Sequence, residues 1–338
     1  MATIRQVAEI AGVSVGTVSN VLNGLGTVTD NNRIKVLKAV EVLDFKPNKA
    51  ARMLKTSRSE SITLILPSIT SLFYPELARG VEDVAREKGF SVILCNSDRS
   101  RHEEDRYIDF HIQSNIDGLI VVKPHMDKER VEALQSTTSV VLIDADEKQM
   151  QDINLVNSDS YFGQMEAVRY LYRLGHREIG YIGGQLDAKS DFDRLNAFRD
   201  AHEIYEIPLN ENNIKCGVYS FDHGYLSALT ILNRPDRPTA ILCANDIIAF
   251  GALRSARELG LHVPDDVSIM GFDNIEASVY CEPQLTTVNH PKYELGRVSA
   301  LMLIAKIQNE AEPSKHLQLR TSVVVRESTA PPRKKAKE

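Results

Sequence analysis

The sequence predicts a small all-α head of the helix-turn-helix type, followed by an α/β body of two doubly wound parallel-sheet subdomains. Three observations lead to this prediction. Apolar residues recur at helical spacing over residues 4–22, with a glycine between two short helices. After Ser59, apolar strand-like runs alternate with helical segments. That alternation occurs twice, over stretches of similar length, which favours two sheets over one.

The head begins with two short helices joined by a tight turn. Thr3 can cap the first helix, Gly12 supplies the turn, and Ser14 can cap the second helix. The first helix carries an apolar stripe at Ile4, Val7, Ala8 and Ala11. The same spacing predicts a third helix with its stripe at Val36, Ala39, Val40 and Leu43. This pattern is typical of a DNA-binding motif whose second helix enters the major groove, although a helical bundle without a DNA role shares the same periodicity.

The body is predicted from its alternation of strands and helices. In the first half we expect strands at 61–66, 91–95, 118–122 and 140–143, with helices at 74–88 and 103–113. In the second half we expect strands at 179–182, 240–243 and 267–270, with helices at 162–174, 192–202, 224–232 and 247–259. Ligands bind outside the carboxyl ends of parallel strands, so a crevice between the halves is the expected site.

Charge is unevenly distributed along the 338 residues, whose net charge is −6. Residues 1–60 hold nine Lys/Arg against five Asp/Glu, which gives +4 and leaves −10 on the remainder. A basic head on an acidic body fits DNA binding at one end of the chain. The four cysteines are scattered without CxxC spacing, and no apolar run approaches a membrane span or an export signal. We therefore expect a cytoplasmic protein with free thiols.

Residue identities give a closer resemblance. The pattern AxxAGVSxxTVSxVLN at residues 8–23, followed by Pro47-Asn48-Lys49-Ala50-Ala51-Arg52-Met53-Leu54, resembles the start of the LacI/GalR family of bacterial regulators. The resemblance implies a periplasmic-binding-protein-like body and a homodimer, or a dimer of dimers, on a pseudo-palindromic operator. It implies a DNA-binding domain (1–46), a hinge helix and linker (47–58), and an effector and dimerisation domain (59–328). That domain divides into an N-subdomain (about 59–160 and 290–320) and a C-subdomain (about 161–289 and 321–328), before a flexible basic tail (329–338).

The resemblance also nominates residues that meet DNA. At the start of the second helix, Val15, Gly16 and Asn20 are expected near base edges. Many relatives carry Arg at the position of Asn20, so a different operator is expected. Backbone-positioning contacts are expected from Thr3, Ser14, Thr17, Ser19 and Asn31. In the hinge, Asn48, Ala51 and Leu54 are expected on the DNA, with Leu54 wedged into the minor groove.

Effector contacts are nominated in the same way, and the expected effector is a sugar or sugar derivative. The nominated side chains combine aromatic faces with charged groups at strand ends: Phe73, Tyr74, Asp98, Lys123, Asp144, Arg194, Tyr219, Asn245, Asp246 and Asp273. Aromatic rings suit the apolar face of a sugar, and carboxylates, amides and an arginine suit its hydroxyls. Lys123 could alternatively meet a sugar acid or phosphate, or lie in a solvated loop. Asp246 could instead cap the helix that follows it.

Other function classes fit the sequence poorly. GxSxG, HExxH, P-loop and GxGxxG patterns are missing, so we expect no catalytic set, no metal and no cofactor. Two alternatives remain open: a solute-binding protein without a DNA role, and a metabolic enzyme with an accessory helical head. The favoured interpretation is a ligand-controlled transcriptional repressor, and whether the ligand acts as inducer or corepressor is left open.

Overall fold

The computed structural model describes residues 2–22, 28–45, 58–150, 152–309 and 315–333, and the chain forms two compact units, Met1–Ser59 and Glu60–Glu338. The hinge positions Asn48, Ala51 and Leu54 therefore lie outside the described residues. Each unit has its own apolar core. The predicted fold class, a helix-turn-helix head with an α/β body, is confirmed.

The first unit contains α1 (Ile4–Ala11), α2 (Val15–Leu22) and α3 (Asp30–Val42). Thr3 caps α1, because its hydroxyl accepts from the Gln6 amide and the Gln6 side chain accepts from the Thr3 amide in return. Gly12 ends α1 at φ 65°, a conformation that glycine adopts without strain. The core lies between the three helices at Val7, Ala8, Ala11, Val18, Val21, Val36 and Ala39.

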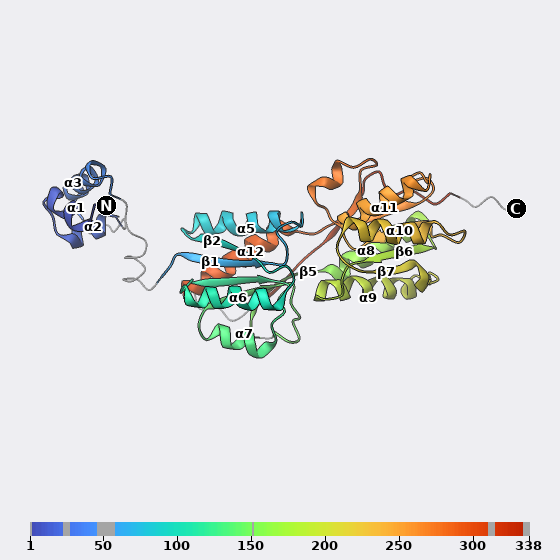
Figure 1. Ribbon diagram of the computed structural model, residues 1–338, viewed down its shortest axis with the longest axis horizontal. Coiled ribbons are helices and arrows are strands. Elements are labelled where there is room, and N and C mark those ends of the chain that lie inside the picture. Colours follow the sequence, from blue (N-terminus) through green and yellow to red (C-terminus); the bar gives the residue numbers. More distant parts are fainter. Residues whose placement is uncertain (1, 23–27, 46–57, 151, 310–314, 334–338) are drawn as a thin grey trace. The chain divides into compact units, whose positions relative to one another are not determined.

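The first sheet of the second unit has the order β11-β5-β4-β3-β1-β2 and is parallel throughout. Its described strands are β1 (Ser61–Leu66), β2 (Ser91–Asn96), β3 (Gly118–Val122), β4 (Ser139–Ile143), β5 (Asn154–Ser158) and β11 (His316–Leu319). One face is covered by α5 (Tyr74–Glu87) and α12 (Lys292–Ile307), and the other by α6 (Arg101–Gln113) and α7 (Lys128–Gln135) (Figure 1).

The second sheet has the order β12-β10-β9-β8-β6-β7, and only β12 runs antiparallel to its neighbour among the described strands. These strands are β6 (Ile179–Gly183), β7 (Ile214–Cys216), β8 (Ala240–Cys243), β9 (Ser268–Asp273), β10 (Thr286–Asn289) and β12 (Ser322–Val324). Two helix pairs accompany the sheet: α8 (Ser160–Leu174) with α9 (Lys189–Ile204), and α10 (Phe221–Leu232) with α11 (Asp246–Glu258). Short 3-10 helices occupy Glu211–Asn213 and Glu276–Val279.

The chain passes between the two halves of this unit three times. It leaves the first sheet between β5 and α8, returns between β10 and α12, and crosses again between β11 and β12. Buried Lys292 lies at the second passage, where its ammonium donates to the carbonyls of Asp273 (2.7 Å) and Asn274 (3.0 Å). These bonds tie the start of α12 to the end of β9.

Residues 329–333, which the sequence suggested as the start of a flexible tail, instead pack on the second half. Thr329 is buried and shares a hydrogen bond of 2.9 Å with the Tyr170 hydroxyl. The carbonyl of Ala330 accepts from buried His176 (2.9 Å), and Arg333 pairs with Asp266 (2.7 Å). The short polar and proline-containing sequence gave no sign of these partners, which lie far away in the chain.

Glycines bring α10 and α11 into backbone contact, and this leads to a stability prediction. A Cβ on Gly224 would lie 2.2 Å from the Ile248 carbonyl oxygen, and one on Gly251 would lie 2.2 Å from that of Phe221. Because neither carbonyl can move alone, we expect Gly224→Ala to lower the free energy of unfolding by about 1–3 kcal/mol or more. Urea denaturation measures this loss.

Gly16→Ala is the matched control, because a Cβ there would meet only the Ser14 hydroxyl, at 3.6 Å. Alanine in a helix interior is favoured over glycine by roughly 1 kcal/mol, so this change should not destabilise the head. Equal stability of wild type and Gly224→Ala would show that α10 and α11 are not packed this closely.

Candidate functional site: a crevice between two sheets

The body contains a cavity of about 330 Å³ between its two halves, a volume within the range of small-molecule sites. Its lining comes from segments that follow strand ends in both sheets. The first half contributes Ser68, Phe73, Tyr74, Arg99, Lys123, Asp144 and Ser158, and the second contributes Gln185, Ser190, Arg194, Tyr219, Asn245, Asp273 and His290, among others. The site is thus where doubly wound sheets place ligands.

Several lining residues adopt a backbone conformation that is unfavourable for side chains other than glycine. The φ angles are 57° at Arg99, 53° at Lys123, 59° at Asp144 and 107° at Asp273. Each of these residues ends or follows a strand, where the chain must turn sharply. Such strained positions concentrate at functional sites, because the surrounding structure must hold them. The shared conformation supports the assignment of this crevice as the functional site.

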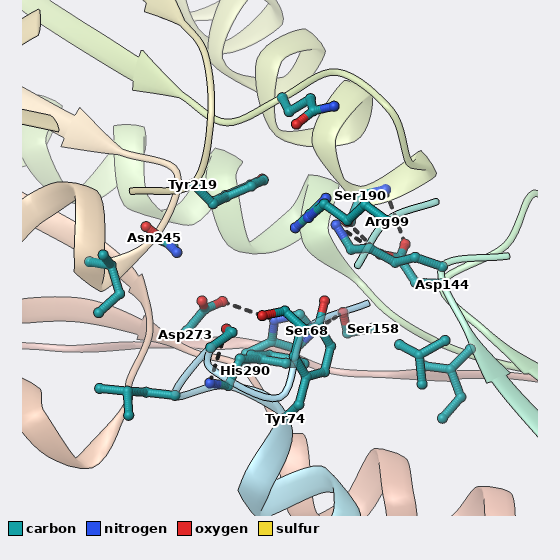
Figure 2. Close-up of a pocket in the computed structure, with 18 of the residues that line it drawn as sticks. Ser68, Tyr74, Arg99, Asp144, Ser158, Ser190, Tyr219, Asn245, Asp273 and His290 are labelled. Carbon is teal, nitrogen blue, oxygen red and sulfur yellow. Dashed lines mark hydrogen bonds and ion pairs between the residues drawn. The ribbon is translucent and has the colours of Figure 1, made fainter. Parts of the chain in front are cut away.

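Aromatic rings form two walls of the cavity. Tyr74 and Tyr219 lie on opposite sides of it, with polar side chains gathered toward either end (Figure 2). Phe73 supports the first wall through edge contacts with Tyr74 (5.2 Å between ring centroids) and His290 (4.7 Å). The Tyr219 hydroxyl donates to Asp191, which fixes the second ring. A flat ligand with polar edges fits between such walls.

Arg194 dominates one end of the cavity. It is buried, stacks over Phe272 and donates to the Ala244 carbonyl at 2.7 Å. Burial alone would lower the pKa of Arg194, but Tyr219 and the carboxylates Asp273 and Asp191 raise it above its usual value. Its Nε atom is buried and has no hydrogen-bond partner in the described part of the chain. The residue also lines the cavity, so its guanidinium can donate to a ligand oxygen at this end.

Asp273, His290 and Ser158 form a hydrogen-bonded chain beside Arg194. The Asp273 carboxylate lies 3.9 Å from Arg194 and 3.3 Å from His290 Nδ1. Burial lowers the pKa of His290 despite the nearby carboxylate, so the ring is neutral at pH 7. A neutral ring can donate from Nδ1 to Asp273 and accept the Ser158 hydroxyl at Nε2, which satisfies both nitrogens.

The other end of the cavity is charged, and its contacts cross between the halves. Lys123 from the first half lies 3.1 Å from Asp191 of the second half, and 3.5 Å from its own half's Asp144. Burial would lower the pKa of Lys123, but these carboxylates raise it. Burial likewise opposes ionisation of Asp191, yet Lys123 and Arg194 bring its pKa down to about 2. Both groups are therefore charged at neutral pH.

Two further contacts cross the crevice. The Asp144 carboxylate accepts from the Ser190 amide (3.1 Å) and hydroxyl (2.6 Å). Arg99 Nη1 lies 3.2 Å from the Asp187 carboxylate. At this end the two halves are therefore joined by the Lys123–Asp191 and Arg99–Asp187 ion pairs and by the Asp144–Ser190 hydrogen bonds.

Most nominated effector residues line this cavity: Phe73, Tyr74, Lys123, Asp144, Arg194, Tyr219, Asn245 and Asp273. Asp98 does not, because it lies in the loop after β2 and accepts from Asn96 at 2.7 Å. Asn245 both lines the cavity and caps α11 by accepting from the Ile248 amide. The sequence reasoning missed Ser68, Arg99, Ser158, Ser190 and His290; the strand-end rule could have found Arg99 and Ser158.

Asp246 is also outside the lining, and the cap of α11 is Asn245 rather than Asp246. It is fully buried, and its carboxyl accepts from the Thr287 hydroxyl (2.5 Å) and the Ile275 amide (2.8 Å). Burial, with Asp273 nearby, raises the pKa of Asp246 to about 8. Its role here is to join α11 to the segments after β9 and β10.

This raised pKa predicts a pH-dependent stability. Because the folded pKa exceeds the ordinary value of 3.8, the contribution of Asp246 is fully present below pH 3.8 and is lost as pH rises through about 8. Asp246→Asn cannot ionise, and its amide oxygen can still accept from the Ile275 amide while its NH2 group donates to the Thr287 hydroxyl oxygen. We expect wild type to lose stability relative to Asp246→Asn between pH 5 and pH 8 in urea denaturation. A stability difference between wild type and Asp246→Asn that stays constant over that range would contradict a raised pKa of Asp246.

In the head, the nominated residues Val15 and Gly16 lie at the start of α2, and Asn20 lies in its last turn. Val15 is 42% exposed and Gly16 is exposed, while Asn20 is half-buried. The Ser14 hydroxyl accepts from the Thr17 amide (3.1 Å) and bonds the Thr17 hydroxyl (2.9 Å), so both side chains sit at the helix N-terminus. An exposed apolar side chain beside hydroxyls at a helix N-terminus fits a base contact flanked by phosphate contacts.

Comparisons with known proteins agree with both units. The profile of bacterial regulatory proteins of the lacI family matches residues 3–48, and that of the periplasmic binding protein-like domain matches residues 168–329. The HTH-type transcriptional repressor PurR of Proteus mirabilis is 35% identical over 332 residues, covering 98% of this chain and 97% of the relative. The chain belongs to the LacI family. It is a DNA-binding transcriptional repressor of the kind controlled by small-molecule effectors, and it is not an enzyme.

Solved structures extend the likeness over nearly the whole chain. A Lac repressor dimer bound to operator and the anti-inducer ONPF has a TM-score of 0.88 at 28% identity, covering 97% of this chain and 99% of the other. A complex of the transcriptional regulator CelR with cellobiose has a TM-score of 0.74 at 28% identity, covering 97% and 100%. Among the described residues, no helix is both long and apolar enough to cross a bilayer.

Proposed function

We propose that this LacI-family member is a homodimeric repressor whose affinity for a pseudo-palindromic operator is set by a sugar or sugar derivative in the crevice. The observation that carries the proposal is the combination of Tyr74 and Tyr219 walls with Arg194 and Asp273 at one end. Rings contact the apolar face of a sugar, and a guanidinium beside a carboxylate offers donors and acceptors for its hydroxyls. The cellobiose complex of the similar CelR regulator supports a carbohydrate ligand.

The proposed DNA contacts divide by role. Val15, Gly16 and Asn20 on α2 approach base edges, with Asn20 able to donate to and accept from adenine. Thr3, Ser14, Thr17, Ser19 and Asn31 position the head on phosphates. The similar Lac repressor, solved as a dimer bound to operator, supports a dimer on DNA. Two-fold symmetry of such a dimer would be matched by a symmetric site, and the proposed location is the cytoplasm.

A selection experiment tests the proposal. The purified full chain is mixed with random duplexes, and bound sequences are recovered and scored for two-fold symmetry. The best duplex is then titrated with and without sugars, sugar acids and nucleosides. We expect a symmetric site and a change of affinity with a sugar. Symmetric binding that responds only to nucleosides would overturn the effector class, and binding with no sequence preference would overturn the operator assignment.

The hinge leucine carries a separate prediction. Leu54 lies outside the described residues, and its proposed role is to wedge into the minor groove at the operator centre. We expect Leu54→Ala to weaken specific operator binding by roughly tenfold or more, with effector binding unchanged. The salt dependence of binding should keep its slope, because no phosphate contact is lost. Unchanged operator affinity of Leu54→Ala in fluorescence anisotropy would contradict the proposed insertion of Leu54 into the minor groove.

A further inference from the structure

The charged end of the crevice has no cation left over for an anionic ligand. Lys123 is held between Asp191 (3.1 Å) and Asp144 (3.5 Å), and Arg99 is held by Asp187 (3.2 Å). Two cations therefore face three carboxylates at this end, and Arg194, which also interacts with Asp191, has a carboxylate partner of its own in Asp273. A ligand phosphate or carboxylate placed here would add a fourth negative group to a partly buried cluster, where like charges repel more strongly than in water.

The carboxylates of this cluster are also anchored by neutral donors, so an incoming anion would not simply displace them. Asp191 accepts from the Ala188 amide (3.1 Å) and from the Tyr219 hydroxyl. Asp144 accepts from the amide and the hydroxyl of Ser190. A carboxylate with several hydrogen bonds to its charged form keeps its charge and its place.

The opposite end of the cavity is suited to neutral oxygen atoms of a ligand. Arg194 and Asp273 both line the cavity, and the guanidinium lies 3.9 Å from the carboxylate. One hydroxyl can accept from Arg194 and donate to Asp273 at once, whereas a ligand anion would be attracted by the first and repelled by the second. His290, the third group at this end, is a neutral ring bonded to Asp273 and Ser158.

We infer that the effector is uncharged: a hydroxyl-bearing ring compound, with its phosphate and carboxylate derivatives rejected by the Lys123–Asp191–Asp144 and Arg99–Asp187 cluster. This inference rests on the proposed function, because it concerns the same crevice. It assigns Lys123 and Arg99 to closing the site, so the sugar-acid and phosphate ligand considered for Lys123 is set aside.

Matched ligand pairs test the inference by isothermal titration calorimetry on the full chain. Each pair shares a ring and differs in charge: glucose with glucose 6-phosphate and glucuronate, galactose with galacturonate, ribose with ribose 5-phosphate, and adenosine with its monophosphate. For any ring that binds, we expect the neutral member to bind at least about tenfold more tightly. Tighter binding of an anionic member would overturn the inference while leaving a crevice effector in place.

A charge variant sharpens the test. Asp187→Asn removes one carboxylate from the cluster and releases Arg99, so the preference for the neutral member should shrink by about tenfold. Glu203→Gln is the matched control, because it removes one exposed charge from the far end of α9 and should leave the preference unchanged. An unchanged preference in Asp187→Asn would contradict the role of the cluster. If no member of any pair binds, the proposed effector class fails and the inference fails with it.

Discussion

Replacement of Arg194 by alanine is expected to abolish the effector response and leave operator binding intact. The buried side chain lines the cavity, donates to the Ala244 carbonyl and lies 3.9 Å from Asp273. Hydrogen bonds to charged groups contribute about 1.5–3 kcal/mol each, so loss of two ligand bonds should weaken effector binding by roughly a hundredfold or more. Calorimetric titration of effector and anisotropy of labelled operator measure the two activities separately.

Arg199→Ala provides the control on the same helix. Arg199 is 44% exposed and pairs with exposed Glu211, so its loss should change neither activity. A melting curve on Arg194→Ala checks that the domain still folds, and Arg194→Lys should restore part of the stability without the effector affinity, because lysine lacks the planar donor set. An effector affinity in Arg194→Ala equal to that of wild type would reject the assignment of this end of the cavity.

Replacement of Lys123 by methionine is expected to produce the largest loss of stability among the crevice residues. It removes the cation from Asp191 and Asp144, which lie 3.1 and 3.5 Å from the ammonium. Breaking a buried pair by removing one partner costs about 3–5 kcal/mol, because the remaining charge stays buried. Urea denaturation of the full chain measures the change in the free energy of unfolding.

A double-mutant cycle separates the ion pair from lost packing. Lys123→Met together with Asp191→Asn should recover part of the loss, with a coupling energy of about 1–3 kcal/mol. Lys128→Met is the control, because Lys128 and Glu132 are exposed on α7 and such pairs contribute at most about 1 kcal/mol. Coupling near zero would mean that the Lys123–Asp191 contact does not hold the halves together.

Long periodic elements and strand-end residues were predictable from the sequence. The helices over 74–88, 162–174 and 247–259 lie within a few residues of α5, α8 and α11, because each carries an amphipathic pattern over more than three turns. The nominated strand-end residues Lys123, Asp144 and Asp273 line one cavity, since carboxyl ends of parallel strands share an edge. Local pattern and sheet geometry were sufficient in these cases.

Features that depend on distant contacts were not predictable. β7 (Ile214–Cys216) has three residues and β5 (Asn154–Ser158) begins and ends with polar ones, so neither shows an apolar run. The helix α7 has only two turns. His290 enters the site only because β10 joins the second sheet, and Asp187 and Asp191 matter only because their cation partners lie 88 and 68 residues away. Ion pairs across the crevice join residues far apart in the chain, so local sequence patterns do not predict them.

One measurement tests the central claim that crevice and head are linked. Operator affinity is measured by anisotropy with and without saturating effector, and effector affinity is measured by calorimetry with and without saturating operator. Thermodynamic linkage requires the effector to change operator affinity by the same factor as the operator changes effector affinity. Control by the effector requires this factor to differ from one. We expect each ligand to change the affinity for the other by the same factor of about 5–150, as an increase or a decrease. In Arg194→Ala we expect no such change. An effector that binds the crevice and leaves operator affinity unchanged would contradict it.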